Sequence, residues 1–312
     1  MSNLDFYDLK RLFHLREILE ALDPREPPRA LFFDPPPNLS LQRAGILSGS
    51  FNPPTLAHVE LGLRARKSFR LDAVLFMISR VTVDKEEAGG LSLEDRLLIL
   101  SSLAGDLGWA CVAVVNRGLY YEQACALRSL LGNRPRLYFI MGTDKVVQIL
   151  DPRYYDDREK ALLTLFTEAQ LIAAPREGLG SPQLEELLDR NENLNFNDRV
   201  YFLPMPEQLK GTSSSAVRVA IEKGESVQGQ LPETVEKFIT ETGAYRRPYD
   251  LRRLLLDRLY AIREWAQENV DFPRLLAIAA EGTERGEKLR SLLRFPLTSE
   301  DQLKDFIQHA LR

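Results

Sequence analysis

The stretch Gly49-Ser50-Phe51-Asn52-Pro53-Pro54-Thr55-Leu56-Ala57-His58 decides the fold. An apolar run precedes it at 44–47 and an amphipathic segment follows it at 56–69, so the sequence predicts a strand, a tight glycine-containing turn and the start of a helix. Bare backbone N–H groups in such a turn, together with the positive end of the helix dipole, make an anion site, most often for phosphate. Thr55 and His58 lie three residues apart and share one face of the first helical turn. A hydroxyl and an imidazole beside a phosphate indicate chemistry on the phosphate itself.

On both sides of this turn, short apolar runs alternate with helical segments. The predicted strands are 43–49, 73–79, 109–115, 136–142, 169–174 and 199–204. The predicted helices are 56–69, 92–104, 121–131, 156–168, 182–190 and 214–223, with another at 232–244. Runs such as 73–78 are apolar throughout, which is typical of parallel strands covered on both faces. The pattern therefore predicts an α/β fold with a doubly wound, Rossmann-like parallel sheet, whose ligands bind beyond the carboxyl ends of the strands.

Two further segments flank the predicted domain of residues 43–245. Residues 1–42 predict an N-terminal helical extension at 4–22 and then a proline-rich, extended connector whose Phe32 and Phe33 pack on the core. Residues 246–312 predict a C-terminal helical appendage. Its apolar stripe needs a cover from its own helices or from another subunit, so we also predict a homo-oligomer. The stripe comprises Leu251, Leu254, Leu255, Leu259, Ile262 and Trp265.

Composition narrows the classes of function. The chain has 312 residues and a net charge of −4, so it lacks the overall positive charge of proteins that bind nucleic acid chiefly through its phosphates. Its two cysteines, Cys111 and Cys125, are predicted to pack in the core, and no disulfide framework is expected. The start of the sequence does not read as a signal peptide, and no run approaches the ~18 apolar residues of a membrane span. We expect a cytoplasmic protein with neither a membrane nor a nucleic-acid partner.

A second motif, Gly211-Thr212-Ser213-Ser214-Ser215-Ala216-Val217-Arg218, follows an apolar run and opens the helix predicted at 214–223. Hydroxyl side chains at a helix start cap exposed N–H groups and also bind anions. Arg218 lies one turn inside, on the face of Ser214, and its rigid fork suits a phosphate. By itself this motif is equally compatible with a plain serine cap beside a surface arginine.

Together, the two motifs resemble those of the nucleotidyltransferase superfamily of adenylyl- and cytidylyltransferases. That superfamily pairs a G-x-F-x-P-x-(H/T)-x-x-H turn with a later (I/T)-S-(S/T)-x-x-(R/K) motif. Within it, the sequence is most similar to nicotinamide/nicotinate mononucleotide adenylyltransferases. Met141-Gly142-Thr143-Asp144 looks like that family's G-x-D motif, and Lys85, Arg96 and Arg176 stand where the family has basic residues. The resemblance covers residues 43–245.

The resemblance implies a reaction and a set of site residues. The 5′-phosphate of a pyridine mononucleotide would attack the α-phosphorus of ATP, and pyrophosphate would leave in line. His58, Thr55, Arg218 and Lys85 would hold and stabilise the phosphates, with Mg²⁺ bridging the oxygens of ATP and no protein metal ligand. The nucleotide-binding residues that the resemblance implies are Gly49, Ser50, Phe51, Gly142, Asp144, Ser213 and Ser214.

Some alternatives stay open. Asn52 and Thr55 differ from the Asp and His of many bacterial members, and the triple serine also occurs in pantetheine-phosphate adenylyltransferases, which carry Lys in place of Arg218. Another nucleotidyltransferase of this fold, using pantetheine phosphate or CTP, is therefore one alternative. A catalytically idle nucleotide sensor or scaffold, acting through its C-terminal helices, is another. For single residues, Lys85 is also compatible with a surface lysine, Asp144 with a helix cap, and Tyr120 and Tyr121 with core packing or stacking on a pyridine ring.

Overall fold

The protein is described from a computed structural model, which covers residues 9–34, 41–81, 90–175, 180–206, 212–245, 257–263, 271–293 and 305. These residues belong to two compact units. One unit spans Ala21–Glu236, and the other combines Met1–Glu20 with Lys237–Arg312. No helix within the described ranges is long and apolar enough to cross a bilayer.

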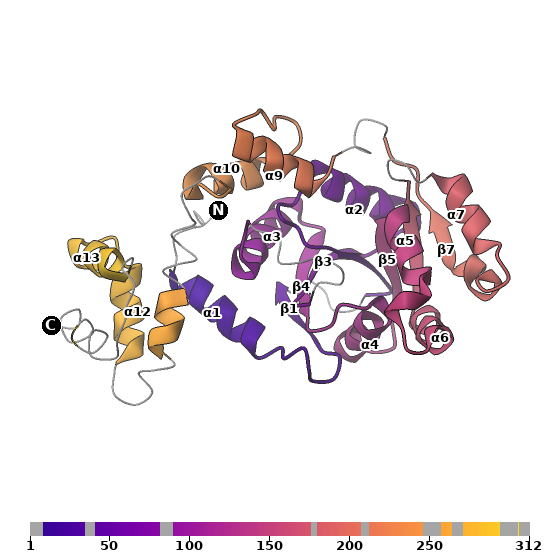
Figure 1. The fold of residues 1–312 in the computed structure, drawn as a ribbon, viewed down its shortest axis with the longest axis horizontal. Coiled ribbons are helices and arrows are strands. Elements are labelled where there is room, and N and C mark those ends of the chain that lie inside the picture. Colours follow the sequence, from indigo (N-terminus) through magenta and orange to yellow (C-terminus); the bar gives the residue numbers. More distant parts are fainter. Residues whose placement is uncertain are drawn as a thin grey trace. The chain divides into compact units, whose positions relative to one another are not determined.

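The larger unit is built on a seven-stranded sheet in the order β1-β4-β3-β2-β5-β6-β7 (Figure 1). All neighbouring strands are parallel except β1 and β4, which are antiparallel. The six strands predicted from the sequence are all present, so the predicted doubly wound α/β sheet is confirmed. The strand bounds are β1 Ala30–Asp34, β2 Arg43–Ser48, β3 Ala73–Ser79, β4 Ala110–Val115, β5 Arg136–Gly142, β6 Ala169–Ala174 and β7 Val200–Phe202.

The strand order creates a switch point between β2 and β5. From β2 the chain builds outward through β3 and β4, then returns to place β5 on the other side of β2. In this arrangement Ala44 of β2 pairs with Ala73 of β3 on one side and with Leu137 of β5 on the other. Open parallel sheets bind ligands at such a point, beyond the carboxyl ends of the strands. Here those ends are Ser48 and Gly142.

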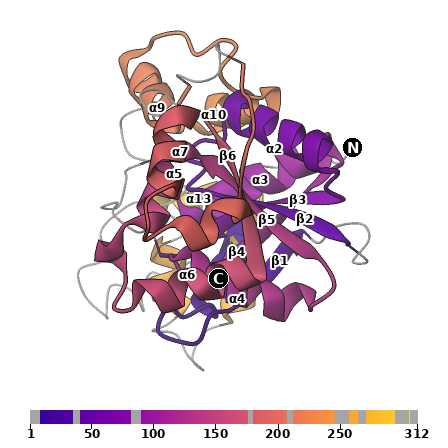
Figure 2. The ribbon, with the colours of Figure 1, turned by 90° about the vertical axis from the view of Figure 1, so that its right-hand side faces the viewer.

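Helices cover both faces of the sheet (Figures 1 and 2). Gly62 of α2 lies against Phe76, whereas the neighbouring Leu75 belongs to an apolar cluster with residues of α4, α5, α6 and α7. Because successive strand residues point to opposite faces, α2 and α4 cover opposite sides. The helices of the larger unit are α2 Leu56–Phe69, α3 Leu93–Leu107, α4 Tyr120–Leu131, α5 Thr143–Leu150, α6 Arg158–Glu168, α7 Ser181–Leu188 and α9 Ser214–Lys223, with 3₁₀ turns at Pro152–Tyr154 and Leu194–Arg199. α10 (Glu233–Thr242) crosses the boundary between the two units.

The connector predicted at residues 23–42 contains a strand that the sequence did not predict. Residues 30–34 form β1, whose Ala30 pairs with Val115 of β4. The strand escaped prediction because it is five residues long, lies between proline clusters and lacks a polar–apolar alternation. It covers the edge of β4, which would otherwise expose unpaired backbone groups. Phe32 packs partly buried against the core, as expected from the sequence.

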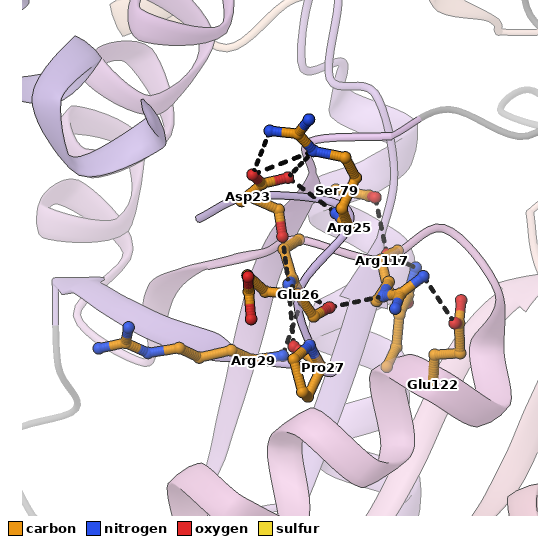
Figure 3. Close-up of polar contacts among 10 residues, drawn as sticks. Asp23, Arg25, Glu26, Pro27, Arg29, Ser79, Arg117 and Glu122 are labelled. Atoms are coloured by element: carbon orange, nitrogen blue, oxygen red, sulfur yellow. Dashed lines mark hydrogen bonds and ion pairs between the residues drawn. The ribbon is translucent and has the colours of Figure 1, made fainter. Parts of the chain in front are cut away.

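Asn116, directly after β4, clamps the chain that leads into β1. Its side chain is 1% exposed, and its Nδ2 donates to the carbonyl oxygens of Asp23 at 2.8 Å, Pro27 at 3.0 Å and Glu26 at 3.3 Å. Its Oδ1 accepts from the Arg29 N–H at 2.8 Å. The clamped segment, residues 23–29, is drawn with its polar contacts in Figure 3. One buried amide thus ties an otherwise irregular segment to the end of β4.

The smaller unit joins the two ends of the chain. It contains α1 (Leu9–Glu20), helical residues 257–263, α12 (Phe272–Ala280) and α13 (Glu284–Leu293). The Phe13 ring lies 5.0 Å from that of Phe272 and 5.5 Å from that of Tyr260, and Arg16 pairs with Asp257 at 2.6 Å. The N-terminal helix and the C-terminal appendage, which the sequence predicts as separate extensions, therefore pack on each other.

The predicted apolar stripe of the appendage is described only in part. Leu259 and Ile262 are buried. Leu251, Leu254, Leu255 and Trp265 lie outside the described residues. The homo-oligomer inferred from this stripe remains a prediction.

Candidate active site at the switch point

The first motif forms the turn between β2 and α2. Gly49 continues from the end of β2, where its N–H donates to the Met77 carbonyl at 3.1 Å. Phe51 has φ of +45°, and its side chain is only 1% exposed. Its ring centroid lies 5.6 Å from that of Phe76 and 5.2 Å from that of His58. Because the Phe51 side chain is buried and anchors the turn in the core, only the backbone of Phe51 can contact a ligand.

Thr55 and His58 hold each other at the start of α2. Thr55 is the N-cap residue and is fully buried. Its backbone N–H donates to His58 Nδ1 at 3.1 Å, and its Oγ1 lies 2.8 Å from the same atom. A backbone N–H can only donate, so Nδ1 is the acceptor and a neutral His58 carries its proton on Nε2. The two residues therefore set up a hydrogen-bond donor at a helix N-terminus, where anions bind.

The second motif contacts the first through Ser214 and Arg218, while its other serines act within α9. Ser213 caps α9 by accepting from the Ala216 N–H at 3.1 Å, and the Ser214 hydroxyl donates to the Pro53 carbonyl at 2.8 Å. Arg218 donates from Nη1 to the Asn52 carbonyl at 2.5 Å and from Nη2 to Ser215 Oγ at 3.1 Å. The serine cap is thus present, and the Arg218 guanidinium, half-buried, lies against the turn of the first motif rather than pointing away from it.

The predicted G-x-D segment lies at the end of β5, next to the turn after β2. Gly142 is the N-cap of α5, and Asp144 is an exposed residue in the first turn of that helix. The helix therefore begins before Asp144, and the interpretation of Asp144 as its cap is wrong. The carboxylate is placed at the switch point between β5 and β2.

A cavity with about 770 Å³ of empty space, part of it open to solvent, lies beyond the ends of β2, β3 and β4. It brings Gly49 and Ser50 of the turn together with Arg96 of α3 and Tyr120 of α4. Among the described residues, the lining does not include His58, Asp144 or Arg218. The lining residues in the described part of the chain are Ser48, Gly49, Ser50, Ser79, Val81, Arg96, Gly118, Leu119, Tyr120, Gln123, Lys145, Gln148, Ile149, Tyr154 and Tyr155.

Aromatic side chains form one wall of the cavity. The Tyr120 ring meets the Phe139 ring edge to face, with centroids 5.3 Å apart, and burial raises the pKa of Tyr120. The Tyr155 hydroxyl donates to the Ile149 carbonyl at 2.8 Å, and burial raises the pKa of Tyr155 to about 12. These phenols stay neutral at physiological pH, so the wall offers ring faces and no negative charge. Tyr121 is not part of this lining, and its ring lies 6.2 Å from that of Tyr155.

Sequence reasoning missed several polar residues of the cavity. Gln123 is the clearest case, because it is only 2% exposed although it lies in a predicted amphipathic helix. The one available signal was a polar residue on the apolar side of that helix. Lys145, Gln148 and Tyr154 offered no signal, since their approach to the turn depends on the sheet order. Three residues that the sequence singled out, Lys85, Arg176 and Gly211, lie outside the described residues.

Comparison with known proteins adds an independent observation. A family model described as cytidylyltransferase-like matches residues 46–220. A probable nicotinate-nucleotide adenylyltransferase of Synechococcus sp. strain JA-3-3Ab is 31% identical over 218 residues, covering 68% of this chain and 99% of that protein. One from Dehalococcoides mccartyi strain 195 is 29% identical, covering 66% of this chain and 98% of that protein. The solved structure of Plasmodium falciparum nicotinic acid mononucleotide adenylyltransferase complexed with NaAD matches 65% of this chain and 97% of that one, with 17% identity and a TM-score of 0.49.

Proposed function

Since the chain belongs to the nicotinate-nucleotide adenylyltransferase family, a group of nucleotidyltransferases within the cytidylyltransferase-like proteins, we propose that it transfers the adenylyl group of ATP to the 5′-phosphate of nicotinate mononucleotide. The products would be deamido-NAD and pyrophosphate. The preference for the acid over the amide is taken from the names of the relatives. The observation that best supports the reaction is the hydrogen-bonded Thr55–His58 pair, which directs an Nε2–H donor at the N-terminus of α2.

The proposed reaction needs positioning and charge stabilisation rather than a nucleophilic side chain. The attacking phosphate oxygen is already anionic, so no general base is required. As the phosphorus is attacked, charge develops on its equatorial oxygens, and fixed donors around them lower the barrier. We assign this task to His58 Nε2–H and to the turn after Gly49. Arg218 would support the turn and the phosphates through its fork, and we keep Thr55 and Lys85 as proposed phosphate-holding residues.

We further propose that the two nucleotides lie on opposite sides of the turn. The adenosine would lie near Gly142 and Asp144 after β5. The mononucleotide would occupy the cavity, where Arg96 and Lys145 supply positive charge and the tyrosine wall can take the pyridine ring. Ser214 would act mainly by holding the second motif against the turn, and Ser213 by capping α9, since their hydroxyls already have these protein partners.

Mg²⁺ enters this proposal as the partner of ATP. Within the described ranges, no group of three or more His, Cys, Asp or Glu could hold a metal ion. The proposal needs no protein ligand, because Mg²⁺ is commonly bound chiefly by triphosphate oxygens and water. When bound, the ion would neutralise charge on the phosphates. His58 and the turn amides would orient the α-phosphate itself.

The test is a pyrophosphate-release assay with Mg²⁺ and ATP, using nicotinate mononucleotide, nicotinamide mononucleotide and pantetheine phosphate in separate reactions. We expect turnover with nicotinate mononucleotide, and a fall in kcat of about 10²- to 10³-fold in His58→Ala, the usual cost of losing one charge-stabilising donor. His14→Ala is the matched control, because His14 is an exposed residue of α1. Preference for pantetheine phosphate, or ATP binding without any turnover, would overturn the proposal.

A further inference from the structure

Gln123 of α4 has a buried hydrogen-bond acceptor to which none of the described residues donates. Its side chain is 2% exposed and belongs to the cavity lining. Nε2 donates to the carbonyl oxygens of Gly118 at 3.0 Å and Arg117 at 3.3 Å. Because carbonyls only accept, these contacts fix which end of the amide is nitrogen. The other end, Oε1, is buried and has no hydrogen-bond partner among the described residues.

The carbonyls that orient this amide are themselves held in place. The Ser79 hydroxyl donates to the Arg117 carbonyl at 2.8 Å. The Arg117 guanidinium donates to the Glu26 carbonyl at 3.2 Å and pairs with Glu122 at 3.3 Å (Figure 3). The segment before α4 is thus tied to β3 and to the N-terminal chain. Gln123 Oε1 is therefore held in a fixed position before any ligand binds, as expected of a group that selects a ligand.

We propose that Gln123 Oε1 accepts a hydrogen bond from a ribose hydroxyl of the bound mononucleotide. A buried acceptor without a partner is unfavourable, and an O–H or N–H donor of a ligand would relieve it. The inference rests on the proposed function, because nicotinate mononucleotide has a carboxylate on its ring. That group has no hydrogen to donate and would be repelled by Oε1. The two ribose hydroxyls are the donors that remain on the sugar.

The experiment compares kcat/KM for nicotinate mononucleotide with the values for its 2′-deoxy and 3′-deoxy analogues, in the wild-type chain and in Gln123→Met. A site built to bind a hydroxyl discriminates strongly against an analogue that lacks it. We expect one deoxy analogue to lose about 10-fold or more in the wild type. In Gln123→Met the same analogue and its parent should differ by less than about 3-fold, because the acceptor is gone. Any change of pocket shape caused by methionine affects both substrates and cancels in the ratio.

Gln148→Met is the matched control. Gln148 also lines the cavity, but its Oε1 already accepts from Lys145 Nζ at 2.6 Å. Its ratio between parent and deoxy analogue should remain that of the wild type.

Three results would overturn the inference. The first is equal wild-type activity on all three nucleotides, and the second is a deoxy penalty that persists in Gln123→Met. The third is a loss in Gln123→Met confined to nicotinamide mononucleotide, which would put the acceptor at the ring. Wild-type turnover of nicotinate mononucleotide is measured first, so failure of the proposed function is recognised separately. Should Gln123→Met fail to fold, Gln123→Leu takes its place in the same ratio, and a wild type without any deoxy penalty overturns the inference in either case.

Discussion

Replacing Asn116 by alanine should destabilise the larger unit by removing the clamp on the N-terminal segment. The side chain is 1% exposed and serves four backbone groups. Glu26, Pro27 and Arg29 are exposed, so water can replace the amide at the Glu26 and Pro27 carbonyls and in part at the Arg29 N–H. The half-buried Asp23 carbonyl and part of the Arg29 N–H contact then remain, and each unsatisfied group costs about 1–3 kcal/mol. With partial access to water, we expect a loss of about 2–4 kcal/mol.

The loss can be measured by urea denaturation and by thermal melting, where it corresponds to a fall in Tm of roughly 5–12 °C for a unit of this size. Asn197→Ala is the matched control, because Asn197 is exposed and its side chain donates, within the described ranges, only to the Asp189 carboxylate at 2.9 Å. Its effect should stay within about 0.5 kcal/mol. A loss below about 1 kcal/mol for Asn116→Ala would refute the reasoning, since it would mean that water satisfies all four backbone groups once the amide is removed.

Three other predictions follow from the same structure. Gly45→Ala should lower the free energy of unfolding by about 1–3 kcal/mol, because the added methyl group would lie 2.7 Å from Leu71 Cδ1 in the core. Gly105→Ala should raise it by about 0.5–1 kcal/mol, because this position on α3 has open space around it and alanine favours the helix. If both variants changed the free energy of unfolding in the same direction, this reasoning would be wrong. Arg218→Lys should lower kcat/KM about 10- to 100-fold, because one ammonium cannot keep both contacts of the fork; full activity would contradict the assigned role. Burial raises the pKa of Tyr155 to about 12. The neutral phenol therefore contributes its full stability below about pH 10, and this contribution is lost as the pH rises through about 12. Over that pH range the melting temperature should fall less steeply with pH in Tyr155→Phe than in the wild type.

Much of the fold could be predicted because its signals are local. The run 73–78 is apolar throughout and became β3, and the segment 56–69 became α2 with the predicted bounds. β1 could not be predicted, since five residues between prolines become a strand only when the open edge of β4 lies beside them. α1 itself was predicted as a helix, within 4–22, but its packing was not, because it is buried by α12, which lies more than 250 positions away in the chain.

The candidate site divides in the same way. The sequence indicated Thr55, His58 and Arg218 from motif spacing, and it indicated the carboxyl ends of the strands as the place for ligands. It did not indicate that Arg218 lies against the carbonyl of Asn52, or that Asn116 and Gln123 would be buried polar residues. Those facts depend on which strands become neighbours, and the strand order is a property of the whole sheet.

The sequence alone determined the alternation of strands and helices, the glycine-containing turn after the first parallel strand, and the family to which the chain belongs. Each of these depends on residues that are close together in the chain, where side-chain spacing and backbone preference act directly. Only the tertiary structure decided that the second motif docks on the first, that β1 closes the edge of the sheet, and that Gln123 carries a buried acceptor with no partner among the described residues. These depend on contacts between distant segments, which form only when burial of the core selects one packing among many.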